Sequence, residues 1–238
     1  MPTVQVGDID MYYEVHGSGE PLVLIGWLAS DLSEMEWLTS WCAQTHRVLA
    51  FDNRGAGRTD KPDAPFSIPM MAADTDALME AVGMSHATVL GVSMGGRIAL
   101  DLALEHPDRV ARLILVSTTA SARPEQSTRM EMLGMLSGLV FRGKHPQPRY
   151  AFARQREASR AYDCVDRLGE INVPTTILHG RKDKIAPLRE AERMRRGITD
   201  SQMVTFHGGH LFFLLRQRKW FFDSLASALA TGSSLHAS

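Results

Sequence analysis

Five short apolar runs along the chain lack polar alternation and are rich in aliphatic and β-branched residues. They are 21–26, 46–52, 87–92, 110–117 and 174–180. Strands that are covered on both faces of a sheet have this pattern. Two further extended runs, 3–6 and 11–15, flank the turn-like sequence GDID and predict an antiparallel hairpin near the start of the chain.

Helical patterns separate these strands. Residues 67–83 place alanine, leucine, methionine and valine on one face and end at Gly83, and residues 96–106 form another helical pattern that stops before Pro107. The repeated change from extended to helical periodicity predicts an α/β fold, with a mostly parallel central sheet and helices on both faces. Ligands bind beyond the carboxyl ends of the strands in such sheets, so we expect the chemistry there.

Residues 120–171 interrupt this alternation, because they contain helical patterns and no strand pattern. We therefore expect residues 1–119 and 172–238 to form one core domain, with residues 120–171 inserted as a short helical cap or lid. Helical spacing predicts one apolar helix face in its second half, made of Ala158, Ala161, Tyr162, Val165 and Leu168. Its first half carries apolar residues that fit either an acyl pocket or ordinary packing. These are Met130, Met132, Leu133, Met135 and Leu136.

The charge balance excludes some classes of partner. Lysine and arginine number 26 against 27 aspartates and glutamates, so the chain has no overall field to hold nucleic acid or an anionic membrane. No apolar run approaches the ~18 residues of a membrane span, and the N-terminal residues lack the pattern of a signal peptide. We expect a soluble cytoplasmic protein that is a monomer or a homodimer and whose partner is a small-molecule substrate.

The remaining motifs indicate neither a metal ion nor an organic cofactor. Cys42 and Cys164 lie far apart, match no metal-ligand spacing and are expected to be reduced packing residues. The sequence DNRGAG at 52–57 lacks the glycine spacing and the lysine of phosphate-binding loops, so we interpret it as a hydrogen-bonded loop brace.

Ser93 lies in the sequence GVSMG, between a predicted strand and a predicted helix. In this context a sharp turn lifts the serine hydroxyl above the edge of the sheet, and small residues are needed beside it because strand and helix approach closely. A serine hydroxyl becomes a strong nucleophile only with a nearby base, which in turn needs an acid to orient it. Asp183 follows the predicted strand 174–180, and His210 follows a further strand predicted from the sequence MVTF at 203–206. The two residues come in the order that this turn requires.

Alternatives remain for both partners of Ser93. Asp183 has charged neighbours that are also typical of a solvated loop, but the competing position after strand 110–117 reads VSTTAS and offers no carboxylate. His207 is the alternative base, although its place at a strand end fits a structural histidine better. His179, which precedes the acid, is also interpreted as structural.

Four motifs in this order resemble those of the α/β-hydrolase family, and most closely its small esterases and lactonases, such as 3-oxoadipate enol-lactonases. They are DNRGAGRTDKP, GVSMGG, HGRKDKIAP and GGH, and the resemblance extends from residue 12 to about residue 229. The resemblance implies the α/β-hydrolase fold and a catalytic triad of Ser93, His210 and Asp183. It also implies an oxyanion hole made by the backbone N–H groups of Trp27 and Met94.

The chain departs from the family pattern at two places. Ile25 stands where the family usually has a histidine, but backbone donors survive a change of side chain, so we expect the oxyanion hole to persist. The ring of Trp27 is expected either to form a pocket wall or only to cover the edge of the sheet. The insertion is shorter than the usual cap, which implies a more open site.

We therefore predict a serine hydrolase that cleaves a small carboxylic ester or lactone through an acyl-enzyme. The alternatives are a C–C bond hydrolase, a perhydrolase or haloperoxidase with the same triad, and a ligand sensor with a vestigial site. Basic residues in the insertion form either a solvated face or, through one arginine, a site for a substrate carboxylate. These are Arg142, Lys144, Arg149, Arg154, Arg156 and Arg160.

Overall fold

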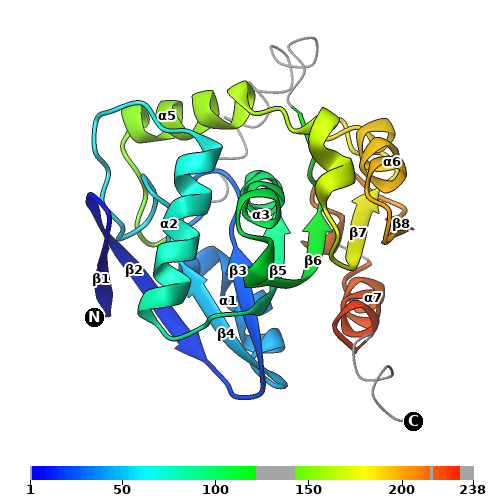
Figure 1. Cartoon of the computed structure of the whole chain (residues 1–238), viewed down its shortest axis with the longest axis horizontal. Coiled ribbons are helices and arrows are strands. Elements are labelled where there is room, and N and C mark those ends of the chain that lie inside the picture. Colours follow the sequence, from blue (N-terminus) through cyan, green and yellow to red (C-terminus); the bar gives the residue numbers. More distant parts are fainter. Residues whose placement is uncertain (1, 122–142, 215–216, 231–238) are drawn as a thin grey trace.

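An eight-stranded sheet forms the centre of the described part of the chain, which comprises residues 2–121, 143–214 and 217–230 of a computed structural model (Figure 1). The strands lie in the order β1-β2-β4-β3-β5-β6-β7-β8. Their bounds are β1 Thr3–Val6, β2 Ile9–His16, β3 Glu20–Ile25, β4 His46–Phe51, β5 Ala87–Val92, β6 Val110–Val116, β7 Thr175–Gly180 and β8 Ser201–Phe206.

The sheet is parallel except at one side. The pairs β1–β2 and β2–β4 are antiparallel, and all other neighbouring strands are parallel. The register sets Ile25 opposite Gly91 and Val92 opposite Val116, so β3, β5 and β6 end side by side. Both the early hairpin and the mostly parallel sheet predicted from the sequence are confirmed.

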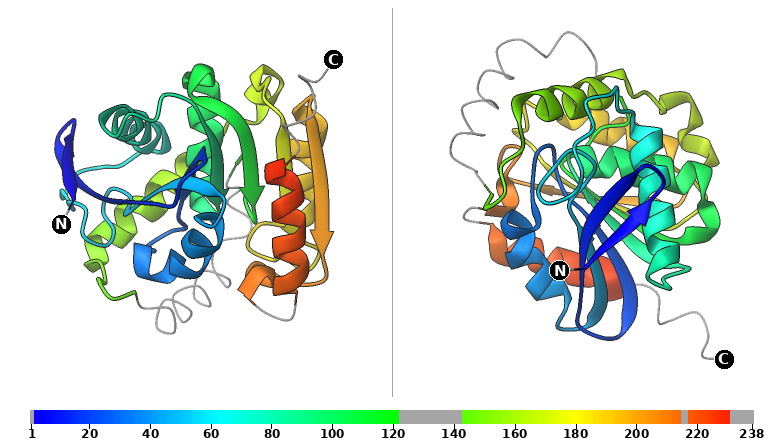
Figure 2. Two further views of the ribbon diagram at one scale, coloured as in Figure 1. Left: turned by 90° about the horizontal axis from the view of Figure 1, so that it is seen from below. Right: turned by 90° about the vertical axis from the view of Figure 1, so that its left-hand side faces the viewer.

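Helices cover both faces of the sheet (Figure 2). The helices α2 Ile68–Ala81, α3 Met94–Glu105 and α6 Leu188–Gly197 pack in one apolar cluster, and α1 Leu32–Cys42 and α7 Arg218–Ala230 pack in another. Successive residues of β3 alternate between the two clusters, since Val23 belongs to the first and Leu24 to the second. Each buried aliphatic side chain contributes roughly 1.5–3 kcal/mol, which explains why these strands are apolar on both sides.

Local signals in the sequence fix the ends of α2. The Ser67 side chain accepts a hydrogen bond from the Met70 N–H, Pro69 lies in the first turn, and Gly83 follows the helix with φ of 64°. The helix expected over 67–83 is therefore confirmed within a residue or two at each end. No described helix has the length and apolar character to cross a membrane.

The described part of the insertion contains the helix α5 Arg149–Ala161 and the 3₁₀ helix η3 Val165–Glu170. The prediction of one helix through Leu168 is wrong, because Tyr162 is extended and Asp163 forms an isolated β-bridge with Ser121. Three residues of the expected apolar face are buried, but they do not lie on one helix: Ala158 belongs to α5, Leu168 belongs to η3, and Tyr162 lies between them. Residues 130–136 and Arg142 lie outside the described residues, and the division into core and cap stays a prediction.

Two short 3₁₀ helices, η1 Pro107–Arg109 and η4 Phe212–Leu214, complete the described elements. Cys42 and Cys164 are buried free thiols, in agreement with the packing role expected for them. Burial raises the pKa of the Cys42 thiol to about 12 and that of Cys164 to about 11, so neither thiol is activated as a nucleophile.

Candidate active site

Ser93 joins the end of β5 to the start of α3 in a strained turn. Its φ of 55° and ψ of −114° lie where a non-glycine residue is rarely found, and such conformations persist only when the surroundings hold them. The Ser93 N–H donates to the Val116 carbonyl at 2.9 Å, and the Thr118 hydroxyl donates to the Ser93 carbonyl at 2.6 Å. The end of β6 therefore fixes the backbone of Ser93 from both sides.

The glycines of the turn are required by close approach of the backbone. A Cβ atom on Gly95 would lie 2.2 Å from the Ile25 carbonyl oxygen, and one on Gly91 would lie 2.4 Å from the Gly95 oxygen. The start of α3 thus lies directly against the end of β3. This contact agrees with the expectation that only small residues fit beside Ser93.

The structure brings the three residues of the predicted triad together. The Ser93 Oγ is 2.9 Å from His210 Nε2, and His210 Nδ1 is 2.8 Å from Asp183 Oδ2. With the carboxylate beside Nδ1, the tautomer that carries its proton on Nδ1 leaves the Nε2 lone pair directed at the hydroxyl. The catalytic roles of the three residues stay predictions, but the geometry is suited to moving a proton from Ser93 to His210.

Asp183 is a fixed, buried carboxylate and not a solvated loop residue. The residue is 5% exposed and its side chain is fully buried, and its Oδ1 accepts from the N–H groups of Ile185 and Ala186 at 2.9 and 2.8 Å. These bonds leave Oδ2 for His210. His179 lies wholly buried beside it, bonded through Nε2 to the Ala186 carbonyl, and burial lowers its pKa, which agrees with a structural role.

The loop of His210 is held by the same strand end that holds Ser93. The Ser117 hydroxyl donates to the His210 carbonyl at 2.8 Å. His207, the alternative base, is exposed, whereas His210 occupies the position beside Ser93. The run VSTTAS offers no carboxylate, and this bracing role of Ser117 and Thr118 was not predicted from it. Adjacent hydroxyl residues at the carboxyl end of a central strand were the available signal.

The N–H groups of Trp27 and Met94 have no hydrogen-bond acceptor among the described residues. Met94 is the first residue of α3, where the helix leaves N–H groups unpaired and its dipole favours negative charge. The close approach of Gly95 to the carbonyls of Ile25 and Gly26 shows that the start of α3 lies against the loop of Trp27. Both donors are therefore available to a ligand, and their part in an oxyanion hole stays a prediction.

The residues around Trp27 explain how the loop tolerates the change at Ile25. The Ile25 side chain is fully buried in the core cluster on the α3 face. The N–H and hydroxyl of Ser30 both donate to the Trp27 carbonyl, at 3.1 and 2.8 Å, and close a tight turn. The centroid of the Trp27 ring lies 6.4 Å from that of Phe213, and the ring packs against the other cluster.

The loop that follows β4 forms a brace, as expected. Asp52 is buried and accepts from the N–H groups of Leu32 and Arg58 at 2.7 and 2.8 Å. Arg54 forms bidentate ion pairs with Asp74, at 2.7 and 2.8 Å, and with Asp8. These bonds use the polar groups of the loop internally, which argues against a phosphate site there.

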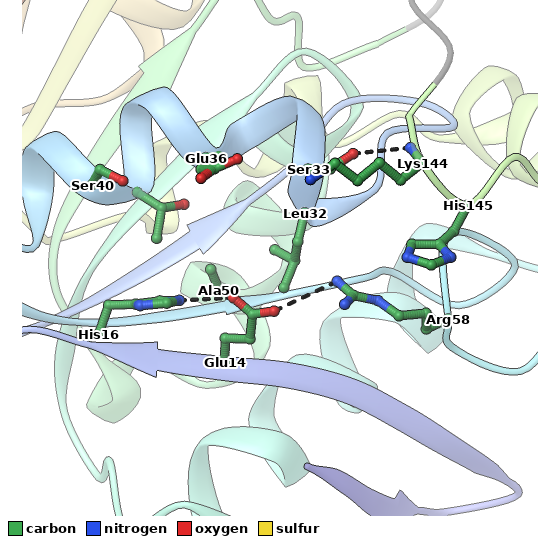
Figure 3. A pocket seen from close by; sticks show the side chains of 11 residues that line it. Glu14, His16, Leu32, Ser33, Glu36, Ser40, Ala50, Arg58, Lys144 and His145 are labelled. Atoms are coloured by element: carbon green, nitrogen blue, oxygen red, sulfur yellow. Dashed lines mark hydrogen bonds and ion pairs between the residues drawn. The ribbon is translucent and has the colours of Figure 1, made fainter. Parts of the chain in front are cut away.

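A polar pocket of about 250 Å³ lies between β2, α1 and residues 144–145 (Figure 3). Arg58 lies 3.6 Å from Glu14, which also contacts His16 at 2.8 Å, so charges within the pocket pair with one another. Among the described residues, its lining includes no member of the triad. We assign it no part in the chemistry.

Comparison with known proteins identifies relatives across nearly the whole chain. The model of a family described as alpha/beta hydrolase fold matches residues 22–147. The chain is 28% identical to a protein of Azorhizobium caulinodans that is named provisionally as a carbamate hydrolase, covering 89% of this chain and 92% of that protein.

Solved structures give the same result for the fold. An esterase from Exiguobacterium antarcticum is 27% identical, with a TM-score of 0.82 and coverage of 94% of this chain and 97% of that one. An enol-lactonase from Burkholderia xenovorans LB400 is 23% identical, with a TM-score of 0.85 and coverage of 96% and 99%. The second likeness concerns the fold alone.

Proposed function

Because the chain belongs to the α/β-hydrolase family, we propose that it is a serine hydrolase that cleaves a small carboxylic ester or lactone through an acyl-enzyme. The observation that carries the proposal is the continuous chain of short contacts from Ser93 Oγ through His210 to Asp183, at 2.9 and 2.8 Å. The similarity to a solved esterase supports the choice of bond.

In the first half of the reaction, Ser93 Oγ attacks the carbonyl carbon of the substrate while His210 Nε2 takes its proton. Asp183 holds the imidazole in position and stabilises the imidazolium that forms. The N–H groups of Trp27 and Met94 donate to the oxyanion of the tetrahedral intermediate. When the intermediate collapses, the C–O bond breaks, and His210 returns the proton to the leaving alkoxide.

In the second half, His210 takes a proton from water, and the resulting hydroxide attacks the acyl carbon. A second tetrahedral intermediate then releases the carboxylic acid and restores the Ser93 hydroxyl. General base catalysis contributes ~10²–10⁴-fold, and one oxyanion donor contributes about 3 kcal/mol. Side chains and backbone groups perform every step, so we expect activity to survive dialysis against EDTA.

The test compares three proteins on a panel of p-nitrophenyl esters and lactones: wild type, Ser93→Ala and His207→Ala. His207 is the matched control, because it is an exposed histidine three residues from His210. We expect Ser93→Ala to lose at least ~10³-fold in kcat and His207→Ala to retain wild-type activity. Equal activity of Ser93→Ala and wild type would overturn the proposal.

Product analysis separates ester hydrolysis from other reactions of the same triad. Release of a ketone from a β-diketone, with no ester turnover, would replace the proposal by C–C bond hydrolysis. Halide oxidation that depends on peroxide and a carboxylic acid would indicate perhydrolysis. Slow turnover of every substrate, with normal covalent labelling of Ser93, would favour a ligand sensor.

A further inference from the structure

One side chain of α5 fastens the insertion to the loop that carries Trp27. Gln155 is fully buried, its Oε1 accepts from the Ala29 N–H at 3.0 Å, and its Nε2 donates to the Arg54 carbonyl at 2.7 Å. Figure 1 shows α5 crossing the end of the sheet from which these loops emerge. A single amide therefore joins three segments that are distant in sequence.

The loop needs an external restraint because its backbone is strained. Ala29 has φ of 66°, a left-handed conformation that an alanine rarely adopts unless its surroundings hold it there. Ile25, which precedes Gly26, offers the loop no polar side chain to hold it, because its apolar side chain is buried in the core. The Asn53 amide reaches the Gly26 carbonyl only at 3.4 Å, a long hydrogen bond. The bond between the Ala29 N–H and Gln155 Oε1, at 3.0 Å, is shorter than the Asn53 bond, and it is made by the residue whose backbone is strained.

A second contact ties α5 to the helix that carries Met94. The Arg97 guanidinium, one turn into α3, donates to the Ser159 carbonyl at 2.6 Å and to the Ser159 hydroxyl at 2.5 Å. The insertion thus contacts both elements that present the unpaired N–H groups.

We propose that Gln155 is a positioning residue for the oxyanion hole: its bonds to Ala29 and Arg54 hold the Trp27 N–H in place and couple the docking of α5 to catalysis. The inference rests on the proposed function. A buried amide with both polar groups bonded cannot be lost without leaving the Ala29 N–H and the Arg54 carbonyl unpaired. Because an oxyanion donor acts mainly on the transition state, the loss should fall on kcat more than on KM.

The experiment uses three variants of the full chain. Gln155→Met has nearly the same volume and removes both hydrogen bonds. Ala158→Gly is the matched control, because it weakens the same helix at a buried position and leaves Gln155 intact. For each protein, kcat and KM are measured on an ester that the wild type cleaves, together with the affinity for a trifluoromethyl ketone, whose serine adduct carries an oxyanion.

We expect Gln155→Met to lower kcat by about 10–100-fold, to weaken ketone binding by a similar factor and to change KM by less than about threefold. Ala158→Gly should keep both quantities within about twofold. Wild-type kcat and ketone affinity in Gln155→Met would overturn the inference. So would an equal loss in Ala158→Gly, because the effect would then come from the helix and not from the amide.

Gln155→Glu, the third variant, provides a separate readout if Gln155→Met does not fold. A protonated glutamic acid accepts from Ala29 and donates to Arg54 as the amide does, whereas the ionised form loses that donor. The kcat of Gln155→Glu should therefore fall with rising pH through a titration that the wild type lacks. A pH profile identical to that of the wild type would contradict the proposal. Absence of any ester turnover or ketone adduct in the wild type would instead refute the proposed function, and the inference with it.

Discussion

Replacing Gly95 by alanine tests how closely the nucleophile turn and the loop of Trp27 must approach. The new Cβ would lie 2.2 Å from the Ile25 oxygen and 2.6 Å from the Gly26 oxygen, whereas ordinary contact begins at 3.4 Å. Both neighbours are backbone atoms, so no side chain can rotate away. The start of α3 and the loop must therefore separate by roughly 1 Å, and the N–H groups of Met94 and Trp27 separate with them.

A displacement of this size should cost ~10²-fold in kcat, and overpacking should cost about 1–3 kcal/mol of stability. The control is Gly169→Ala, because the nearest atom to a Cβ there is the Gly197 oxygen at 4.0 Å. Urea unfolding gives the folded fraction of each protein, and ester hydrolysis is then compared at equal concentrations of folded protein. A Gly95→Ala enzyme with kcat within threefold of wild type would refute the claim that this contact sets the donor positions.

Three further substitutions test other parts of the account. Asp183→Asn should lower kcat by ~10³–10⁴-fold with little change in KM, because an amide favours the wrong tautomer of His210, and steady-state kinetics measures this. Glu34 lies half-buried in the first turn of α1, where burial raises its pKa from 4.5 to about 7, so wild-type stability falls as pH rises across that window. Glu34→Gln should therefore stabilise the protein at pH 8, by about 1–2 kcal/mol, because solvent screens part of the cost of the half-buried charge. Urea unfolding at pH 5 and pH 8 would contradict this if both proteins showed the same pH dependence. Arg54→Leu should cost about 3–5 kcal/mol in the same assay, because it leaves the Asp74 carboxylate buried and unpaired, and a loss below 1 kcal/mol would disprove that role.

The sheet, and the meeting of Ser93, His210 and Asp183 at its edge, could be predicted from the sequence because both leave local signals. Strands buried on both faces need continuous apolar residues, and the turn at Ser93 needs glycines where backbones meet. Asp183 and His210 each follow a strand, so the topology alone brings them to one edge of the sheet. These features require no knowledge of side-chain contacts between distant segments.

The contacts that the insertion makes leave no such signal. Gln155 is one polar residue in a helix with many, and its partner Ala29 is separated from it by 126 positions. The end of α5 at Ala161 was also missed, since helical spacing continues to Leu168 although the chain turns extended at Tyr162 to pair near Ser121. Pairings of this kind depend on the packed fold and not on local periodicity.

The most direct test of the central claim, an activated serine at position 93, is covalent labelling followed by mass spectrometry of the intact and digested protein. The folded wild type should take up one fluorophosphonate, and the adduct should map to the peptide that contains Ser93. Ser93→Ala should remain unmodified, and His210→Ala should react more slowly by ~10²-fold or more, because its hydroxyl has lost the base. An unlabelled folded wild type, or an adduct on a different residue, would contradict the account.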